Sequence, residues 1–174
     1  MLNNLREICE TFRVSTPDAY LAGQIVGDPF KTADLILAPD GVPYLYRWHV
    51  VPRNDRGNVY FHIQVRSDPE RPLHDHPWDN TSVILSGGYD EDWFTPGFEG
   101  MCVSPMIHRR GAVTRRSAEM AHRLHLPIGI PYTMTLFTTG PKIREWGFWY
   151  PHGWVSNKEV CITEGNVSTH KQEM

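Results

Sequence analysis

The chain has 174 residues, with 17 Lys and Arg against 20 Asp and Glu, so its formal net charge is −3. This length suits one domain, and a weakly acidic chain without a basic block is not the composition of a nucleic-acid-binding protein. The 6 Trp, 7 Tyr and 7 Phe residues exclude a disordered chain, which would have no core in which to pack them.

The segment 1–30 predicts two short helices. Apolar residues recur at helical spacing at Leu2, Leu5, Ile8, Cys9 and Phe12. A second helix is indicated by Thr16 as a hydroxyl N-cap, with Pro17 at the first helical position. We expect that helix to end near Gly27, where the pattern of the sequence changes.

From residue 31 the chain consists of short apolar or alternating runs that Gly and Pro turns separate, which indicates strands. The segment 59–66 alternates apolar and polar residues, as a half-buried strand does. Besides a short apolar run at 33–37, the predicted strands are 44–51, 59–66, 73–76, 81–86, 101–107, 111–115, 121–126, 133–138 and 145–150. We therefore predict a single all-β domain over 1–174, with its barrel at 31–155 and a polar, irregular tail at 156–174.

The cysteines and the N-terminus indicate the cellular setting. Cys9, Cys102 and Cys161 are widely spaced and form no Cys-x-x-Cys pair. The first residues lack the apolar core of a signal peptide, and no apolar stretch is long enough to span a membrane. We expect a cytoplasmic protein with reduced cysteines and no contact with membranes.

The histidines carry the functional signal. His74 and His76 lie two residues apart, so on a strand they share one face with their Cα atoms about 6.6 Å apart. Two imidazoles in that arrangement can bind one divalent metal ion at about 2.0–2.1 Å. An isolated pair of this kind is more often a surface feature beside a turn, so the rest of the pattern decides.

The later spacing resembles the two motifs of the cupin superfamily, G-x5-H-x-H-x(3 or 4)-E-x6-G and G-x5-P-x-G-x2-H-x3-N. The first motif is matched by His74, His76 and Gly88, and the second by Gly111 and His122. The resemblance covers residues 44–150. Within the superfamily, the chain resembles small, single-domain RmlC-like cupins of bacterial or phage type. The chain departs from both motifs at some positions. In the first motif, Asp68 replaces the leading glycine and Thr81 replaces the glutamate. In the second motif, the proline, the second glycine and the asparagine are replaced by Ser117, Glu119 and Leu126.

The resemblance implies a cupin β-barrel, also called a double-stranded β-helix or jelly roll, with one divalent transition metal held by His74, His76 and His122. Fe²⁺, Ni²⁺, Mn²⁺ and Zn²⁺ all suit such donors. Asp79 is a possible fourth ligand from the turn after His76. Without it, three histidines and open positions resemble the thiol dioxygenase branch of the family. His125 competes with His122, but only His122 lies at the spacing of the motif.

Further residues are candidates for the pocket, each with an ordinary alternative. Trp78 either walls the pocket mouth or packs at the rim of the barrel, and Tyr89 is either an acid–base or orienting hydroxyl or a solvated tyrosine. Arg47 clamps a carboxylate or phosphate if it points inward and is solvated otherwise. His62 contacts substrate only if the polar face of its strand lines the barrel, and alternation alone does not decide this. Thr81 occupies the glutamate position.

Three functions follow as hypotheses. The first is a metal-dependent enzyme, dioxygenase-like with Fe²⁺, and the second is a cupin that binds a sugar-like or carboxylate ligand without turnover. The third is a metal-free epimerase-like cupin that pairs Tyr89 with His76 or His122. The partner in each case is a small molecule. The aromatic segment 145–154 either stacks on a ligand or, as we expect, serves the core and a homodimer interface.

Overall fold

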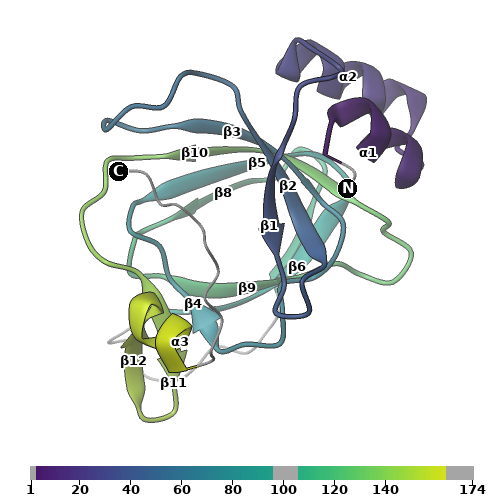
Figure 1. Ribbon diagram of the computed structural model, residues 1–174. Coiled ribbons are helices and arrows are strands. Elements are labelled where there is room, and N and C mark those ends of the chain that lie inside the picture. The colour runs from purple at the N-terminus through teal and green to yellow at the C-terminus, as the bar shows by residue number, and fades with distance from the viewer. Residues whose placement is uncertain (1–2, 96–105, 164–174) are drawn as a thin grey trace.

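In the computed structural model, which describes residues 3–95 and 106–163, two antiparallel sheets face each other (Figure 1). The first sheet has the order β1 (Asp34–Leu37), β2 (Pro43–His49), β3 (Val59–Gln64), β10 (Thr133–Thr139), β5 (Asn80–Ser86) and β8 (Val113–Arg116). The second has the order β12 (Gly153–Ser156), β11 (Gly147–Tyr150), β4 (Leu73–His74), β9 (Ala121–His125), β6 (Gly88–Phe94) and β7 (Met106–Arg109). The predicted all-β class is confirmed.

Two helices begin the described chain, α1 (Leu5–Thr11) and α2 (Thr16–Val26), as the sequence predicts. Asn4 caps α1, because its side chain accepts a hydrogen bond from the Glu7 N–H. Ser15, rather than the expected Thr16, caps α2, and Gly27 ends that helix with φ at +81°. Both helices are too short to be stable alone, so their apolar faces must pack on the barrel.

The helices cover the outer face of the first sheet near β2 and β3 (Figure 1). The contact buries one cluster formed by Leu5, Ile8, Ala22, Val26, Tyr46, Trp48, Phe61, Ile63, Tyr132 and Met134. Because neighbouring residues of a strand point to opposite faces, the polar residues between them, Arg47 and His62, point toward the second sheet. This settles which face of the segment 59–66 lines the barrel: the polar one.

The chain passes from the first sheet to the second at Gly87 and Gly88, between β5 and β6. Gly87 has φ at +71°, which favours glycine. A Cβ atom on Gly88 would lie 2.4 Å from the backbone oxygen of His108. The two glycines are therefore required by this crossing, and they allow β6 to enter the second sheet directly after β5.

Several boundaries differ from the sequence prediction. Residues 88–94 and 153–156 form the strands β6 and β12, where the sequence indicated turns and connecting segments. The expected irregular tail begins instead as helix α3 (Asn157–Thr163), whose Val160 is 4% exposed. Most of the predicted strand 101–107 lies outside the described residues. No helix in the described ranges is long and apolar enough to cross a membrane.

Asp18 of α2 fixes the helices to the barrel, so its removal should destabilise the fold. Its Oδ2 accepts hydrogen bonds from Ser86 Oγ at 2.6 Å and Tyr132 Oη at 2.8 Å. We expect Asp18→Ala to lower the free energy of unfolding by about 3 kcal/mol, because two buried hydroxyls lose their acceptor. Urea denaturation measures this, with the exposed Asp55→Ala as the control. Equal midpoints for the two variants would contradict the assignment.

The Asp18 carboxylate should also make the free energy of unfolding depend on pH. Burial alone would raise the pKa of Asp18, but its hydrogen bonds from Ser86, Tyr132 and Ser15 outweigh burial and lower it. The stabilisation is therefore complete above the pKa of an unfolded aspartate, about 3.9, and is lost as the pH falls through the lower pKa of the folded protein.

Candidate metal centre

Three histidine side chains converge between the sheets. His74 of β4 lies opposite His122 of β9 in the strand register, and His76 follows two residues after His74. The Nε2 atoms of His76 and His122 are 2.9 Å apart, and one ring nitrogen of each histidine lies within 4.8 Å of the others. Among the described residues, no other group of three His, Cys, Asp or Glu side chains comes this close.

The separation of these nitrogens suits a shared ion. An ion about 2.1 Å from both Nε2 atoms would see them at an angle of about 90°, the angle between neighbouring ligands of an octahedral ion. All three donors are neutral nitrogen ligands, which iron, nickel, manganese and zinc accept. The donor set therefore fits one divalent transition-metal ion.

Burial keeps these imidazoles uncharged. Desolvation, followed by the positive charge of Arg116, lowers the pKa of both His74 and His122 to about 4. Burial, with His122 as the next cause, lowers the pKa of His76 well below its ordinary value. Because metal ions bind the neutral ring, no proton has to be displaced from these rings at neutral pH.

Glu91 of β6 orients the third histidine, and the sequence motifs did not point to it. Its Oε1 lies 2.6 Å from His122 Nδ1, and the residue is 1% exposed. A carboxylate only accepts hydrogen bonds, so His122 must carry its hydrogen on Nδ1. The lone pair of His122 Nε2 is then directed at His76 and His74, as a metal ligand requires.

Glu91 is held by three further N–H groups. Arg116 donates from Nε to Oε1 at 2.6 Å and from Nη2 to Oε2 at 2.7 Å, and His108 Nε2 lies 2.8 Å from Oε2. Burial would raise the pKa of Glu91, but the hydrogen bonds from His122 and Arg116 hold it well below its ordinary value. The carboxylate is therefore ionised and fixed in place.

Tyr89 belongs to this network and not to a solvated strand end. It is 1% exposed, and its hydroxyl accepts a hydrogen bond from Arg116 Nη2 at 3.2 Å. Its ring packs edge-on against His108 at 5.3 Å. The hydroxyl thus supports the Arg116–Glu91 pair.

Neither alternative ligand joins the three histidines. Asp79 Oδ1 accepts a hydrogen bond from the Ala118 N–H at 2.7 Å, which fixes the segment before β9. His125 lies on the opposite face of β9 from His122 and its Nε2 is 2.8 Å from Asp92 Oδ2. Asp75, between the two motif histidines, is fully buried and accepts hydrogen bonds from Arg144, Gly147 and Trp154.

Of the other pocket residues, Trp78 lies beside the histidines and Thr81 does not face them. The Trp78 ring stacks on His76 with centroids 4.9 Å apart and planes at 14°. Phe137 packs against both of these rings, at 5.7 Å from Trp78 and 6.0 Å from His76. Strand alternation gives Asn80 the face of its cross-strand neighbour Arg116, so Thr81 points to the other side of β5.

Arg47 and His62 lie beyond Phe137 on the same inner face of the first sheet. The His62 ring stacks on Phe137 with centroids 5.3 Å apart, and Arg47 Nε donates to His62 Nε2 at 3.3 Å. Both residues that the sequence left undecided therefore line the barrel.

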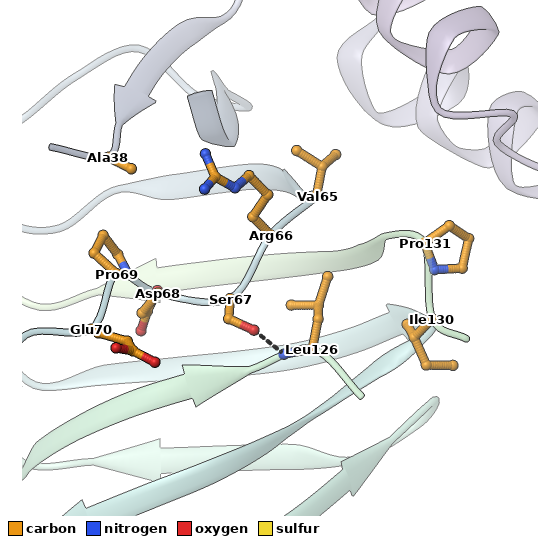
Figure 2. A pocket seen from close by; sticks show the side chains of 10 residues that line it. All are labelled: Ala38, Val65, Arg66, Ser67, Asp68, Pro69, Glu70, Leu126, Ile130 and Pro131. Atoms are coloured by element: carbon orange, nitrogen blue, oxygen red, sulfur yellow. Dashed lines mark hydrogen bonds between the residues drawn. The ribbon is translucent and has the colours of Figure 1, made fainter. Parts of the chain in front are cut away.

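A pocket of about 450 Å³ lies at the barrel edge, away from the histidines (Figure 2). It lies between the segment after β3 and the segment after β9, where the Leu126 N–H donates to Ser67 Oγ at 2.9 Å. Its lining comprises Ala38, Val65, Arg66, Ser67, Asp68, Pro69, Glu70, Leu126, Ile130 and Pro131. None of the three histidines contributes to it, so it is not the metal centre.

Comparison with known proteins shows the fold. No protein-family model and no curated protein matches the chain. The DMSP lyase DddQ from Ruegeria pomeroyi DSS-3 is similar in structure, with a TM-score of 0.54 and 15% identity over 83% of this chain and 77% of that one.

Two further solved structures are similar. One, from a study of the DMSP lyases RdDddP and RnDddQII, has a TM-score of 0.51 and 11% identity over 71% of this chain and 61% of that one. An RmlC-like cupin from Desulfovibrio desulfuricans has a TM-score of 0.41 and 18% identity over 65% of this chain and 98% of that one. The likeness to the two structures with TM-scores above 0.5, together with the two facing antiparallel sheets, confirms the predicted fold class, a cupin-type jelly roll.

The geometry around Glu91 predicts the protonation state of the centre. In the metal-free protein, we expect His122 to be neutral at pH 6 with its hydrogen on Nδ1, and His74 to be neutral as well. Two-dimensional ¹⁵N NMR of the imidazole rings measures both properties. The exposed His152 serves as an internal reference. A His122 ring that is protonated at pH 6, or that carries its hydrogen on Nε2, would contradict the structure.

Proposed function

We propose that this protein is a metal-dependent cupin enzyme that binds one divalent transition-metal ion through His74, His76 and His122 and acts on a small molecule. The observation that carries the proposal is the convergence of three neutral imidazoles, one of them fixed in its metal-binding tautomer by Glu91. With its hydrogen on Nδ1, His122 keeps the Nε2 lone pair available for an ion.

The ion, when bound, would supply Lewis acidity or electron transfer at its open coordination positions. Three neutral imidazoles cancel none of its charge, which favours anionic substrates. With Fe²⁺ the site suits non-haem dioxygenase chemistry, and with Ni²⁺, Mn²⁺ or Zn²⁺ it suits isomerase-like or hydrolase-like reactions.

The side chains of the chain itself position and shield this centre. Glu91 and Arg116 hold His122, and Trp78 supports His76 by stacking on its ring. Phe137 adds apolar surface next to His76. We further propose, from the sequence, that the protein is cytoplasmic and forms a homodimer.

Ligand binding without metal is the second candidate. It is favoured by one observation: His76 Nε2 and His122 Nε2 are close enough to form a direct hydrogen bond, so the pair is satisfied without an ion. An epimerase-like role for Tyr89 is not favoured, because its hydroxyl is bound to Arg116 and the residue is almost fully buried.

The metal site predicts a contrast between two histidine substitutions. We expect the wild type to bind Fe²⁺, Ni²⁺ or Zn²⁺ at one ion per chain, His76→Ala to lose the ion and His125→Ala to retain it. Metal content after incubation and desalting measures this. Equal metal contents in the two variants, or a wild type that stays free of all three metals, would favour the ligand-binding candidate.

The role of Glu91 predicts a contrast between two neighbouring carboxylates of β6. We expect Glu91→Gln to weaken metal affinity by about 10- to 100-fold, because the outer partner that fixes His122 is weakened. Asp92→Asn should leave the affinity unchanged, since Asp92 binds His125 and Arg123 on the other face. Titration with Ni²⁺ measures both affinities, and thermal melts verify that the variants fold. Equal Ni²⁺ affinities of the Glu91→Gln and Asp92→Asn variants would show that Glu91 does not act on the metal centre.

A further inference from the structure

The inner face of the first sheet carries an arginine without a carboxylate partner. Arg47 of β2 is half-buried, and its Nε donates to the Nε2 of His62. Within residues 3–95 and 106–163, its Nη atoms donate to no protein acceptor. The nearest acidic residue along the register, Asp34, instead contacts His49 at 3.5 Å and Arg53 at 3.8 Å.

The Arg47 guanidinium is held in a defined orientation. It lies over the Tyr60 ring, with its central carbon 4.9 Å from the ring centroid. The Tyr60, His62 and Phe137 rings stack in turn, with centroids 5.8 and 5.3 Å apart and planes within 26° of parallel. Stacking covers the flat face of a guanidinium and leaves its N–H edge free to bind an acceptor.

Among the described residues, no carboxylate forms an ion pair with this cation, and the charge of Asp34 acts on it only from a distance. Burial lowers the pKa of Arg47, which shows the cost of holding a charge there, yet a guanidinium stays protonated in proteins. Burial also lowers the pKa of His62 well below its ordinary value, with Arg47 as the next cause, so this ring is neutral. A buried charge is expensive without a partner, and a site that binds an anion gives it one.

A continuous aromatic surface connects Arg47 with the three histidines. Phe137 contacts His62 on one side, and His76 and Trp78 on the other. A small molecule that reaches from the metal centre to Arg47 would pass along the Phe137 ring. Such a molecule has an anionic group at one end and an apolar segment next to it.

We propose that Arg47, positioned by His62 and Tyr60, binds the anionic group of the substrate, so that the substrate is a small organic carboxylate, phosphonate or phosphate. This inference rests on the proposed function, because it names the substrate class of the same site. The free N–H edge of Arg47 can donate hydrogen bonds to a planar carboxylate or to a tetrahedral phosphoryl group, and binding measurements distinguish them.

The experiment titrates the full-length protein with propanoate, methylphosphonate and the neutral propanamide, followed by NMR of the Arg47 Nε–H and the His62 ring. We expect one of the two anions to shift both signals with saturation, and propanamide to shift neither. Arg47→Met should weaken that binding at least tenfold, and Arg47→Lys should weaken it less. The control Arg53→Met removes an exposed arginine that also donates to a histidine, and should bind as the wild type does.

The titration is run on metal-free and on Ni²⁺-loaded protein. If an anion binds through Arg47 but no metal binds, the proposed function fails and the anion site stands. If metal binds but the Arg47 and His62 signals of the wild type do not move with either anion, the anion site is refuted and the metal centre stands. Shifts with propanamide equal to those with the anion that binds, or equal affinities for Arg47→Met and Arg53→Met, would also refute it. The wild-type signals test the inference even if Arg47→Met does not fold.

Discussion

The buried ion pair between Arg116 and Glu91 connects the two sheets and determines how the centre is built. Arg116 ends β8 at the edge of the first sheet, and Glu91 lies in the middle of β6 in the second. Both are almost fully buried, at 3% and 1% exposed. Such a pair stabilises a fold only when its remaining donors and acceptors are satisfied, and here His122, His108 and Tyr89 satisfy them. Geometry at the histidines therefore depends on the contact between the sheets.

The covering of the first sheet by α1 and α2 explains why the barrel interior is polar. The helices take the apolar face of β2 and β3, with Trp48 and Phe61 at its centre. Strand alternation then directs Arg47 and His62 inward, although burial of polar groups is unfavourable unless they find partners. An interior with these residues is poorly suited to be only a hydrophobic core. It is suited to hold a polar ligand, which is the general use of small barrels with polar linings.

The sequence predicted the three histidines because their positions follow from local spacing and a known motif. It did not identify Glu91, for two physical reasons. Gly87 and Gly88 were interpreted as a turn and no strand was predicted directly after them, whereas the glycines allow the chain to cross between sheets and continue as β6. The partners of Glu91 are also distant in sequence, since Arg116 is 25 residues away and His122 is 31. The alternation of apolar and polar residues in 59–66 also left open which face of this strand lines the barrel. Only the packing of the two helices on its apolar face decides this.

The charges of the interior lead to one further consequence for ligand choice. Glu91 is ionised, but Arg116 cancels its charge in a bidentate pair. The three candidate ligands are neutral imidazoles. Among the described residues, Arg47 forms no ion pair with a carboxylate, and a divalent ion would add to its positive charge. Since the Coulomb interaction is strong where water is excluded, such an interior with its ion bound would attract small anions. Fixed aromatic surfaces at Phe137 and Trp78 then limit which of those anions fit.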